Sequence, residues 1–531
     1  MKLPPNLCAV THFFISPLQT LTLQRVSSVR NQHLCYNSSI MLKPLFQSYI
    51  FIFAFLPVLV FGFFLIPGGA GRSGRSGGLR RVFLTAISLL FFACFGLKNF
   101  AIFLASVAAN TVFALLIDRA ADAEKRRKAL LFTAIAANLA LLGFYKYSGA
   151  LPIAISFYTF QQISFLTDLS RGEIELDLPD YLLYITFFPK ILQGPIVRYR
   201  EMKEQFDRAG ETRFSGERFL RGLFLFTLGL AKKVLLADYL SGSVDYGYSI
   251  LPRLTWLDAM IVMIGFSLQL YLDFSGYCDM GEGVCEMIGI ELPENFHLPY
   301  RTGNIRDFWN CWHITLSRFF LKYLYIPLGG NRKGRARTYL NLMIVFLLSG
   351  IWHGAGLTFL VWGGMHGVMS VLHRFLCDVK ASKQGRSPKE ITLLPDHPVF
   401  RFCSVILNFL YVSVAWVFFR ADSVHQALQL LKIVFSKPWL RCSIRLAKSC
   451  QLDEIWYALK ILHLDNWQYS GYVSMWIVLI VSGLIAFNRH TFREYAQRHR
   501  IGTFTYILLA VLFAWCVISL GEVSTFLYFK F

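Results

Sequence analysis

Charged residues are scarce in this sequence, and so are the motifs of soluble enzymes. Asp, Glu, Lys and Arg make up 16% of the 531 residues, against about a quarter in an ordinary soluble domain. The eleven cysteines include no CxxC pair and no metal-site spacing, which argues against a metal centre and against a disulfide framework. No GxSxG elbow joins a strand to a helix, so a serine acyl-enzyme has no support.

Apolar residues, by contrast, are abundant. Hydrophobic residues form 55% of the chain, phenylalanine occurs 50 times, and the mean hydropathy is +0.47. Several segments approach the ~20 apolar residues that cross a bilayer. They are residues 49–66, 82–97, 100–117, 129–142, 220–236, 257–272, 339–360, 399–419, 472–487 and 503–520. We therefore predict an all-α polytopic membrane protein with about 11 to 13 transmembrane or re-entrant helices.

The net charge of +21 is concentrated in short loops between the apolar segments. The basic clusters are residues 72–81, 119–128, 332–337, 374–389 and 489–500. This distribution is typical of cytoplasmic loops, which also attract anionic membrane lipids. Because no aromatic-interleaved basic platform accompanies the charge, we predict no nucleic-acid partner.

Residues 1–40 differ in composition from the rest of the chain. They mix prolines, arginines and apolar residues without the charged, apolar and cleavage regions of a signal peptide. Met41 then opens the first strongly apolar run. We predict that residues 1–40 are an extension that is not native and that residues 41–531 form one membrane domain.

Two Trp-His pairs are the candidates for chemistry. Trp352 and His353 lie inside the apolar segment 339–360. His353 is about fourteen residues from the start of that segment, which corresponds to roughly 20 Å of helix. Ionisable residues at such a depth are costly and usually functional.

The other pair, Trp312-His313, follows the polar run 301–307. A helix over 306–323 would place His313 on one side with Asn310 and Ser317. We expect this helix to be half-buried and re-entrant. We also expect His353 to be the reacting group of the site and His313 to assist it.

Lys190, Gln193 and Arg198 occur in segment 187–199, which two prolines and a glycine exclude from regular helix. Irregular backbone at membrane depth requires protein or water around it. These three side chains are therefore expected to line a polar site or to emerge at an interface.

Two further groups of polar residues have alternative interpretations. Asp273 and Asp279 follow the apolar segment 257–272 and either belong to a polar site or cap the helix end. Segment 151–165 has a polar side that faces either a water-filled cavity or neighbouring helices through hydrogen bonds. Its members are Ser156, Thr159, Gln162 and Ser164.

Histidine suits proton transfer near neutral pH, because its imidazole can act there as a base that takes the proton of a reacting group. Burial keeps imidazole neutral and so able to act as this base. Glycines near His353 would allow close helix packing. They are Gly350, Gly354, Gly356, Gly363, Gly364 and Gly367. For His366 and His373 we expect structural roles.

Six motifs together resemble the membrane-bound O-acyltransferases, within them the alginate O-acetyltransferase AlgI-like branch. They are LPIAISFYTF (151–160), FFPKILQGPIVRY (187–199), DFSGYCDM (273–280), IRDFWNCWHITLSRFFLKYLYIPLGG (305–330), IWHGA (351–355) and WVFFRA (416–421). The resemblance implies that His353 is catalytic with His313 as its companion. Four residues differ from those that are usual at their positions in this branch. They are Ala154, Gly303, Glu282 and Glu286.

We predict these catalytic residues together with a set of substrate-binding residues and no metal. The substrate-binding set is Trp312, Trp352, Asn310, Ser317, Lys190, Gln193, Arg198 and Asp273. The resemblance also implies an MBOAT-like fold around a central tunnel, in a multi-pass protein of the bacterial inner membrane.

The implied activity moves an acetyl group from a cytoplasmic donor, acetyl-CoA or another acyl thioester, to an exported polysaccharide of the alginate type. A periplasmic acetyl carrier or acetyltransferase is the alternative acceptor, and no cofactor is bound. The runner-up is acyl or D-alanyl transfer to another cell-wall polymer. A transporter or flippase, in which histidine would relay protons, belongs to a different class. We find no inverted repeat of the kind that secondary transporters often contain.

Overall fold

The computed structural model describes residues 44–68, 75–149, 151–388, 390–436, 440–450, 452–463, 469–498 and 502–522. The predicted extension 1–40 lies outside the described residues. Within them the protein is helical, and its extended pairing is confined to one isolated bridge between Phe296 and Trp312. The all-α prediction is confirmed.

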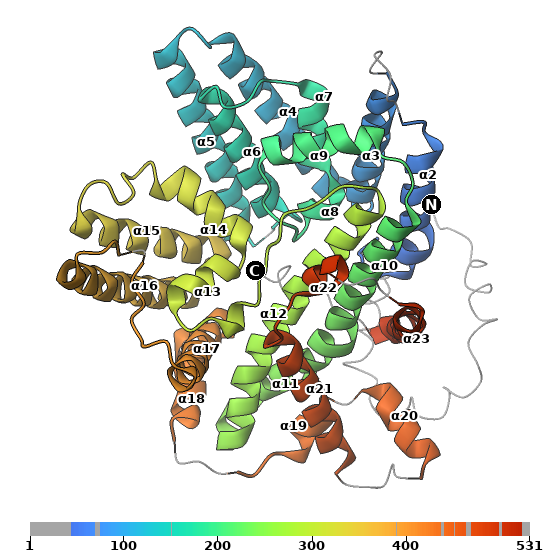
Figure 1. The fold of residues 1–531 in the computed structure, drawn as a ribbon, viewed down its shortest axis with the longest axis vertical. Helices are drawn as coiled ribbons and strands as arrows, with labels where there is room; N and C mark the ends of the chain where they lie inside the picture. Colours follow the sequence, from blue (N-terminus) through green and yellow to red (C-terminus); the bar gives the residue numbers. More distant parts are fainter. Residues whose placement is uncertain are drawn as a thin grey trace, which may run out of the picture.

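Figure 1 shows the helices in their order along the chain. They are α2 (Leu56–Leu65), α3 (Arg75–Ala93), α4 (Leu97–Arg119), α5 (Glu124–Tyr147), α6 (Ile155–Ser170), α7 (Leu178–Thr186), α8 (Phe188–Ile191), α9 (Tyr199–Glu211), α10 (Gly216–Ala231), α11 (Asp238–Ser249), α12 (Trp256–Met287), α13 (Ile305–Cys311), α14 (Ile314–Phe320), α15 (Arg335–His353), α16 (Leu357–Gln384), α17 (Pro398–Arg420), α18 (Val424–Val434), α19 (Ile444–Lys448), α20 (Asp453–Ile461), α21 (Ser470–Ala486), α22 (Phe492–Arg498) and α23 (Thr503–Ile518).

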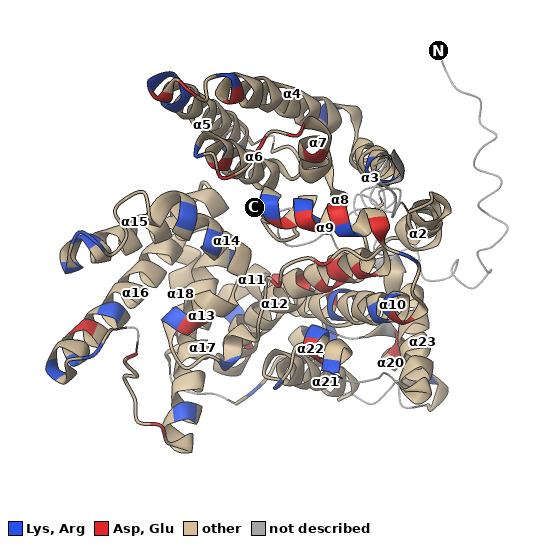
Figure 2. Ribbon diagram, turned by 45° about the horizontal axis from the view of Figure 1, so that its top comes forward, with Lys and Arg blue, Asp and Glu red and all other residues tan. Residues whose placement is uncertain are grey.

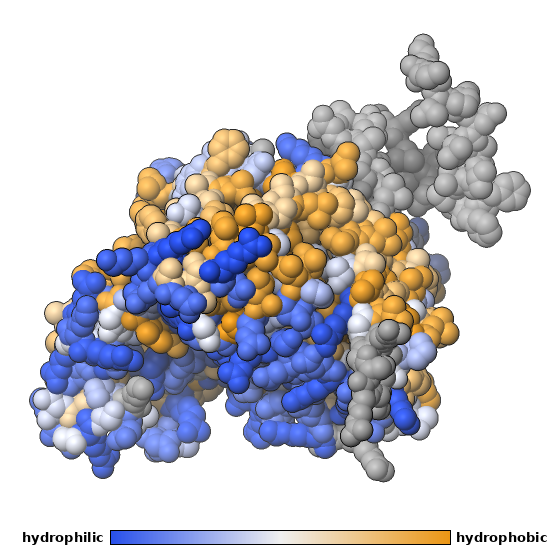
Figure 3. Space-filling model, turned by 90° about the horizontal axis from the view of Figure 1, so that it is seen from above, coloured by the Kyte–Doolittle hydropathy of each residue, from blue (hydrophilic) through white to orange (hydrophobic). Residues whose placement is uncertain are grey.

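Four helices of the described residues are long and apolar enough to cross a membrane: α4, α5, α12 and α17. Shorter apolar helices are Phe51–Leu65, α21 and α23. A broad hydrophobic surface borders a hydrophilic one in Figure 3, and charged residues gather along α9 and at the outer ends of α15 and α16 (Figure 2). Such a division fits a protein embedded in lipid. The number of 11 to 13 spans stays a prediction.

Helix α12 runs through the middle of the molecule beside α10 (Figure 1). Thr255 begins it with a reciprocal capping box to Asp258. Glycines bring the two helices together, because a Cβ on Gly229 would lie 2.6 Å from the Gly276 carbonyl oxygen. Small residues at such a contact let helix backbones approach closely in lipid.

Asp273 and Asp279 lie within α12 rather than at its end, so the helix-cap alternative is wrong. The helix extends beyond the predicted end at residue 272 because each carboxylate has a lysine partner. Lys233 Nζ lies 2.7 Å from Asp273, and Lys232 Nζ lies 2.5 Å from Asp279. Paired charges can be buried where isolated ones cannot.

Helices α15 and α16 form an antiparallel pair. A Cβ on Gly363 would lie 2.4 Å from the Phe346 carbonyl oxygen, and one on Gly350 would lie 2.4 Å from that of Phe359. The close approach predicted from the glycines is confirmed. The pairing also places the basic segments before Arg335 and around Gln384 at the same end of the hairpin.

A topology prediction follows from this common end. Lys333→Cys and Lys383→Cys, in a background without other cysteines, are expected to react with an impermeant thiol reagent only after the membrane is opened, because both lie in basic clusters that the charge pattern predicts to be cytoplasmic. The same background without an added cysteine gives the unspecific signal. Labelling of either variant from outside intact cells would contradict the assignment.

Ala154, one of the departures from the family pattern, adopts a left-handed conformation with φ 62° and ψ 6° immediately before α6. This conformation is strained for residues with a Cβ and free for glycine. We expect Ala154→Gly to stabilise the protein by about 1 kcal/mol, observed as a higher thermal midpoint. Ala134→Gly, at a buried position inside α5, is the matched control and is expected to destabilise it. A lower midpoint for Ala154→Gly would refute the strain argument.

Candidate functional site

His353 is the last residue of α15, so the prediction of one continuous span over 339–360 is wrong. The chain is extended at Gly354, with φ −166° and ψ 162°, and a new helix begins at Leu357. A Cβ on Gly354 would lie 2.1 Å from the Phe359 ring, so only glycine fits this break. His353 is nevertheless 5% exposed, and its burial depends on the surrounding rings rather than on depth within a helix.

Three aromatic rings surround the His353 imidazole. The ring centroids of Trp352, Trp362 and Phe419 lie 4.7, 5.0 and 5.1 Å from it. Lys146, from the end of α5, donates to the Trp352 carbonyl oxygen. This oxygen lies at the C-terminal end of α15, where the helix dipole favours a cation. Lys146 was not singled out from the sequence, since a lysine at a helix end is also a common interface residue.

His313 does not lie on a helix, so the predicted helix over 306–323 is wrong as well. Helix α13 ends at Cys311, Trp312 is extended, and His313 is left-handed with φ 45° and ψ 53°. The cause is pairing with a distant segment. Trp312 bridges Phe296, and the Ile314 N–H donates to the Asn295 carbonyl oxygen at 3.0 Å.

This break buries the His313 ring, which is 1% exposed. It lies 4.9 Å from the Phe274 ring, and its Nδ1 lies 3.1 Å from Asn295 Oδ1. Asn310 is exposed on α13, and the Ser317 hydroxyl donates to the Trp309 carbonyl. His313 therefore does not share a helix side with Asn310 and Ser317, as was predicted. Its ring contacts α12 and the 295–296 segment instead.

Packed tryptophan rings connect the two Trp-His pairs. Trp416 lies 5.0 Å from Trp312 and 5.6 Å from Trp362, between ring centroids. Trp362 in turn contacts His353. The structure thus brings together the four residues that the sequence singled out first.

His366 and His373 occupy different surroundings. The Trp309 indole N–H donates to His366 Nδ1 at 3.3 Å, and Trp362 packs on the same imidazole with ring centroids 5.1 Å apart. His373 Nδ1 lies 3.9 Å from Cys377 Sγ. The structural roles expected for both stay predictions.

Lys190 and Gln193 are fully buried, Lys190 on the one-turn helix α8 and Gln193 in the irregular backbone that was predicted from the prolines and glycine. Helix α8 is a single turn, after which the chain continues without regular structure to Arg198. Lys190 donates to Gln161 Oε1 and lies 4.1 Å above the Tyr184 ring. The segment reaches the His313 region, because the Ile196 N–H donates to the Thr315 hydroxyl oxygen at 2.9 Å.

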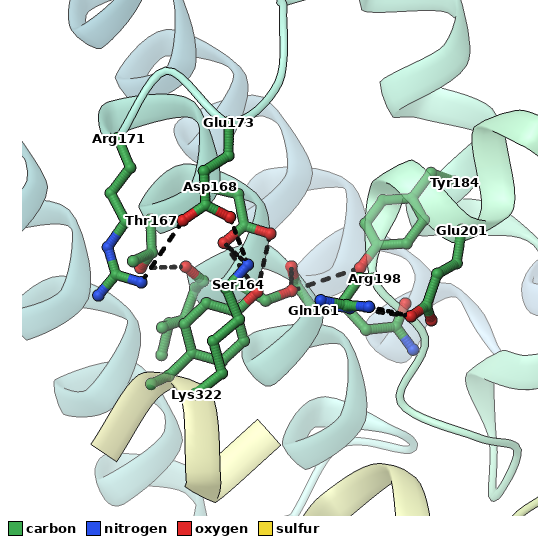
Figure 4. A network of polar contacts seen from close by, with 12 residues as sticks. Gln161, Ser164, Thr167, Asp168, Arg171, Glu173, Tyr184, Arg198, Glu201 and Lys322 are labelled. Carbon is green, nitrogen blue, oxygen red and sulfur yellow. Dashed lines mark hydrogen bonds and ion pairs between the residues drawn. The ribbon is translucent and has the colours of Figure 1, made fainter. Parts of the chain in front are cut away.

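Arg198 and Asp273 are held in ion pairs of their own. Arg198 is half exposed and pairs with Glu201, beside the contacts between α6 and Lys322 (Figure 4). In those contacts Lys322 Nζ lies 2.9 Å from Asp168 and 2.6 Å from Glu173. These charges fasten α6 to the end of α14 and are engaged with one another.

The polar residues of α6 are interior, and one of them supports the interhelical alternative. Gln162 Oε1 accepts from Ser106 Oγ and from Asn110 Nδ2, each at 3.0 Å. The Ser164 hydroxyl donates to the Gln161 carbonyl oxygen. Thr159 is fully buried and Ser156 half-buried. Gln162 therefore helps to fasten α4 to α6.

Glu282 and Glu286, unusual for the family pattern, are matched by arginines of other helices. Arg493 Nε of α22 lies 3.0 Å from Glu282, and an Arg221 nitrogen of α10 lies 3.3 Å from Glu286. Both carboxylates thus fix the helices around the end of α12. Among the described residues no group of three or more His, Cys, Asp or Glu side chains could hold a metal ion.

The structure thus places a buried histidine, His353, at a glycine-broken helix end of an all-helical membrane protein and links it through tryptophan rings to a second buried histidine, His313. The chain belongs to the MBOAT, membrane-bound O-acyltransferase family, whose model matches residues 9–417. It is accordingly an O-acyltransferase. Because the chain belongs to this family, the alternative of a transporter or flippase is set aside.

Named relatives act on different polymers. The chain is 33% identical to the peptidoglycan O-acetyltransferase of Helicobacter pylori over 92% of this chain and 97% of that protein. It is 33% identical to the probable alginate O-acetylase AlgI of Azotobacter vinelandii over 74% of this chain and 78% of that protein. The teichoic acid D-alanyltransferase of Bacillus subtilis is 26% identical over 51% of this chain and 69% of its own length.

Proposed function

We propose that this enzyme moves an acetyl group from a cytoplasmic thioester, acetyl-CoA, to hydroxyl groups of an exported envelope polysaccharide. The observation that carries the proposal is the arrangement at His353: a buried imidazole at a helix end, enclosed by three aromatic rings. An apolar enclosure keeps imidazole neutral and excludes water that would hydrolyse the thioester.

In this proposal His353 takes the proton of the acceptor hydroxyl as its oxygen attacks the thioester carbonyl. The tetrahedral intermediate then collapses, the carbon–sulfur bond breaks, and the proton passes to the thiolate that leaves. His313 positions the donor. Lys190 and Gln193, which lie on the segment that reaches His313, are candidates to contact the bound acyl donor. Trp312 and Trp352, which adjoin the two histidines, are further candidates to contact it.

The acceptor that we favour is peptidoglycan, because the relative named for that polymer matches nearly its whole length. An alginate-type polysaccharide is the second candidate, supported by relatives that match about three quarters of the chain. D-alanyl transfer has less support, since that relative matches about half of the chain. We place the enzyme in the bacterial inner membrane as a multi-pass protein, with a periplasmic acetyl carrier or acetyltransferase as a partner.

A deletion strain tests the acceptor. Ester-linked acetate is measured by mass spectrometry on purified peptidoglycan and, separately, on the soluble exopolysaccharide, with a complemented strain as control. The proposal predicts loss of acetate from the peptidoglycan alone. Loss confined to the exopolysaccharide would transfer the assignment to the alginate-type acceptor, and an unchanged acetate content in both fractions would refute the proposal.

A further inference from the structure

Asn295 lies beside His313 although nothing in the sequence marked it. It is 3% exposed and belongs to the segment that bridges Trp312. Its carbonyl oxygen accepts from the backbone N–H of Ile314, and its side chain faces the His313 ring. One residue therefore holds both the left-handed backbone at His313 and the imidazole.

The orientation of the Asn295 amide follows from its neighbours. Oδ1 lies 3.2 Å from the Thr315 backbone nitrogen, which can only donate, and 2.9 Å from the Thr315 hydroxyl. Nδ2 lies 3.6 Å from Cys278 Sγ. A flipped amide would place its NH₂ group against a backbone N–H, so Oδ1 is the atom at His313.

This orientation determines the tautomer of His313. An amide oxygen only accepts, so Nδ1, at 3.1 Å, carries the hydrogen. A neutral imidazole has one N–H, and the lone pair is therefore on Nε2. Nε2 is buried and has no hydrogen-bond partner among the described residues.

We propose that Asn295 is a positioning residue that acts through His313, holding the imidazole as the Nδ1–H tautomer and leaving Nε2 as its basic nitrogen. The proposal rests on the acyl-transfer function and defines how one part of that site is built. The same contact extends to the irregular segment before α9, because Thr315 Oγ1 both donates to Asn295 and accepts from the Ile196 N–H.

Burial lowers the pKa of His313 to about 3, so the imidazole is neutral across the physiological range. The titratable group beside this contact is the Cys278 thiol of α12, which lies 3.6 Å from Asn295 Nδ2. Nearby on α12, Asp279 is neutralised by its ion pair with Lys232.

The test compares Asn295→Ala with Asn295→Asp. Acetyl transfer is measured from labelled acetyl-CoA into base-labile acetate, in membrane vesicles that contain the full chain and the envelope polysaccharide, between pH 5 and 8. We expect Asn295→Ala to lose about ten- to a hundredfold at every pH, because the ring is no longer held. We expect Asn295→Asp to retain more activity near pH 8 and to lose it progressively toward pH 5.

The sign of this pH effect follows from the added charge. A carboxylate beside Nδ1–H favours the protonated imidazole and raises its pKa by ~1–3 units, from about 3 toward the acidic end of the tested range, so any loss is concentrated near pH 5. Protonation removes the lone pair of Nε2, so the activity of Asn295→Asp relative to wild type falls as the pH falls. Asn138, also buried at 3% exposure but bonded to Asn110, provides the control pair Asn138→Ala and Asn138→Asp, for which no change of pH dependence is expected.

A double-mutant cycle covers the case in which the aspartate variant fails to accumulate. In a His313→Asn background, Asn295→Ala is expected to cost less than threefold, because its effect passes through His313. Wild-type vesicles without transfer would refute the proposed function itself. With an active wild type, equal pH profiles for all Asn295 variants, or additive losses in the cycle, would overturn the positioning role alone.

Discussion

Replacing His353 with alanine is expected to reduce acyl transfer by ~10²- to 10⁴-fold, the usual loss on removing a general base. The imidazole is enclosed by Trp352, Trp362 and Phe419, none of which can replace it as a base. Ester-linked acetate on the polysaccharide is measured in a deletion strain that expresses the variant. Abundance in the membrane is matched to wild type by immunoblot.

His373→Ala is the control for loss of a histidine elsewhere in the bundle, since its ring contacts Cys377 and lies on the neighbouring helix α16. It is expected to retain near wild-type acetate. Near wild-type transfer by His353→Ala at normal abundance would show that His353 is not the base.

The second large effect separates the two histidines. His313→Asn is expected to retain more activity than His353→Asn, since an amide can still hydrogen-bond but cannot act as a base at neutral pH. The backbone at His313 favours this comparison, because asparagine tolerates the left-handed conformation with φ 45° better than most residues. His313→Ala is expected mainly to raise the KM for the acyl donor.

Initial rates against donor concentration, at matched expression, distinguish these outcomes. His353→Asn is expected to lower kcat, whereas the His313 variants are expected to raise the KM for the donor. Equal and complete loss in the two asparagine variants would contradict the division of labour and indicate that the histidines form a joint catalytic pair.

Local sequence patterns predicted the parts of the fold that local forces decide. The apolar segments 100–117, 129–142 and 399–419 correspond to α4, α5 and α17, because length and hydropathy determine which helices suit a bilayer. The irregular backbone around Lys190 and Gln193 was also predictable, since proline and glycine exclude regular helix there.

Contacts between distant segments explain what the sequence did not reveal. The break at His313 depends on Asn295 and Phe296, which pair with the chain around Trp312, and nothing within residues 306–323 signals it. Helix α12 extends past Asp273 because Lys233 of a neighbouring element neutralises the carboxylate. Single-segment periodicity contains no information about such partners.

The candidate site shows the same contrast. His353 and His313 were found because ionisable residues are rare among apolar segments, and the structure connects them through Trp362 and Trp416. Asn295 was missed, because an asparagine in a polar connection is common and only its contact with the imidazole distinguishes it.

The most direct test of the account follows labelled acetyl groups in inverted membrane vesicles that contain the full chain and its polysaccharide. Labelled acetyl-CoA is added on the cytoplasmic face, and base-labile label is counted in the polysaccharide fraction. The account predicts time-dependent label with wild-type enzyme and ~10²-fold less or lower with His353→Ala at equal abundance. Absence of label with the wild type, or equal label with both, would contradict the central claim that His353 catalyses acetyl transfer to the polymer.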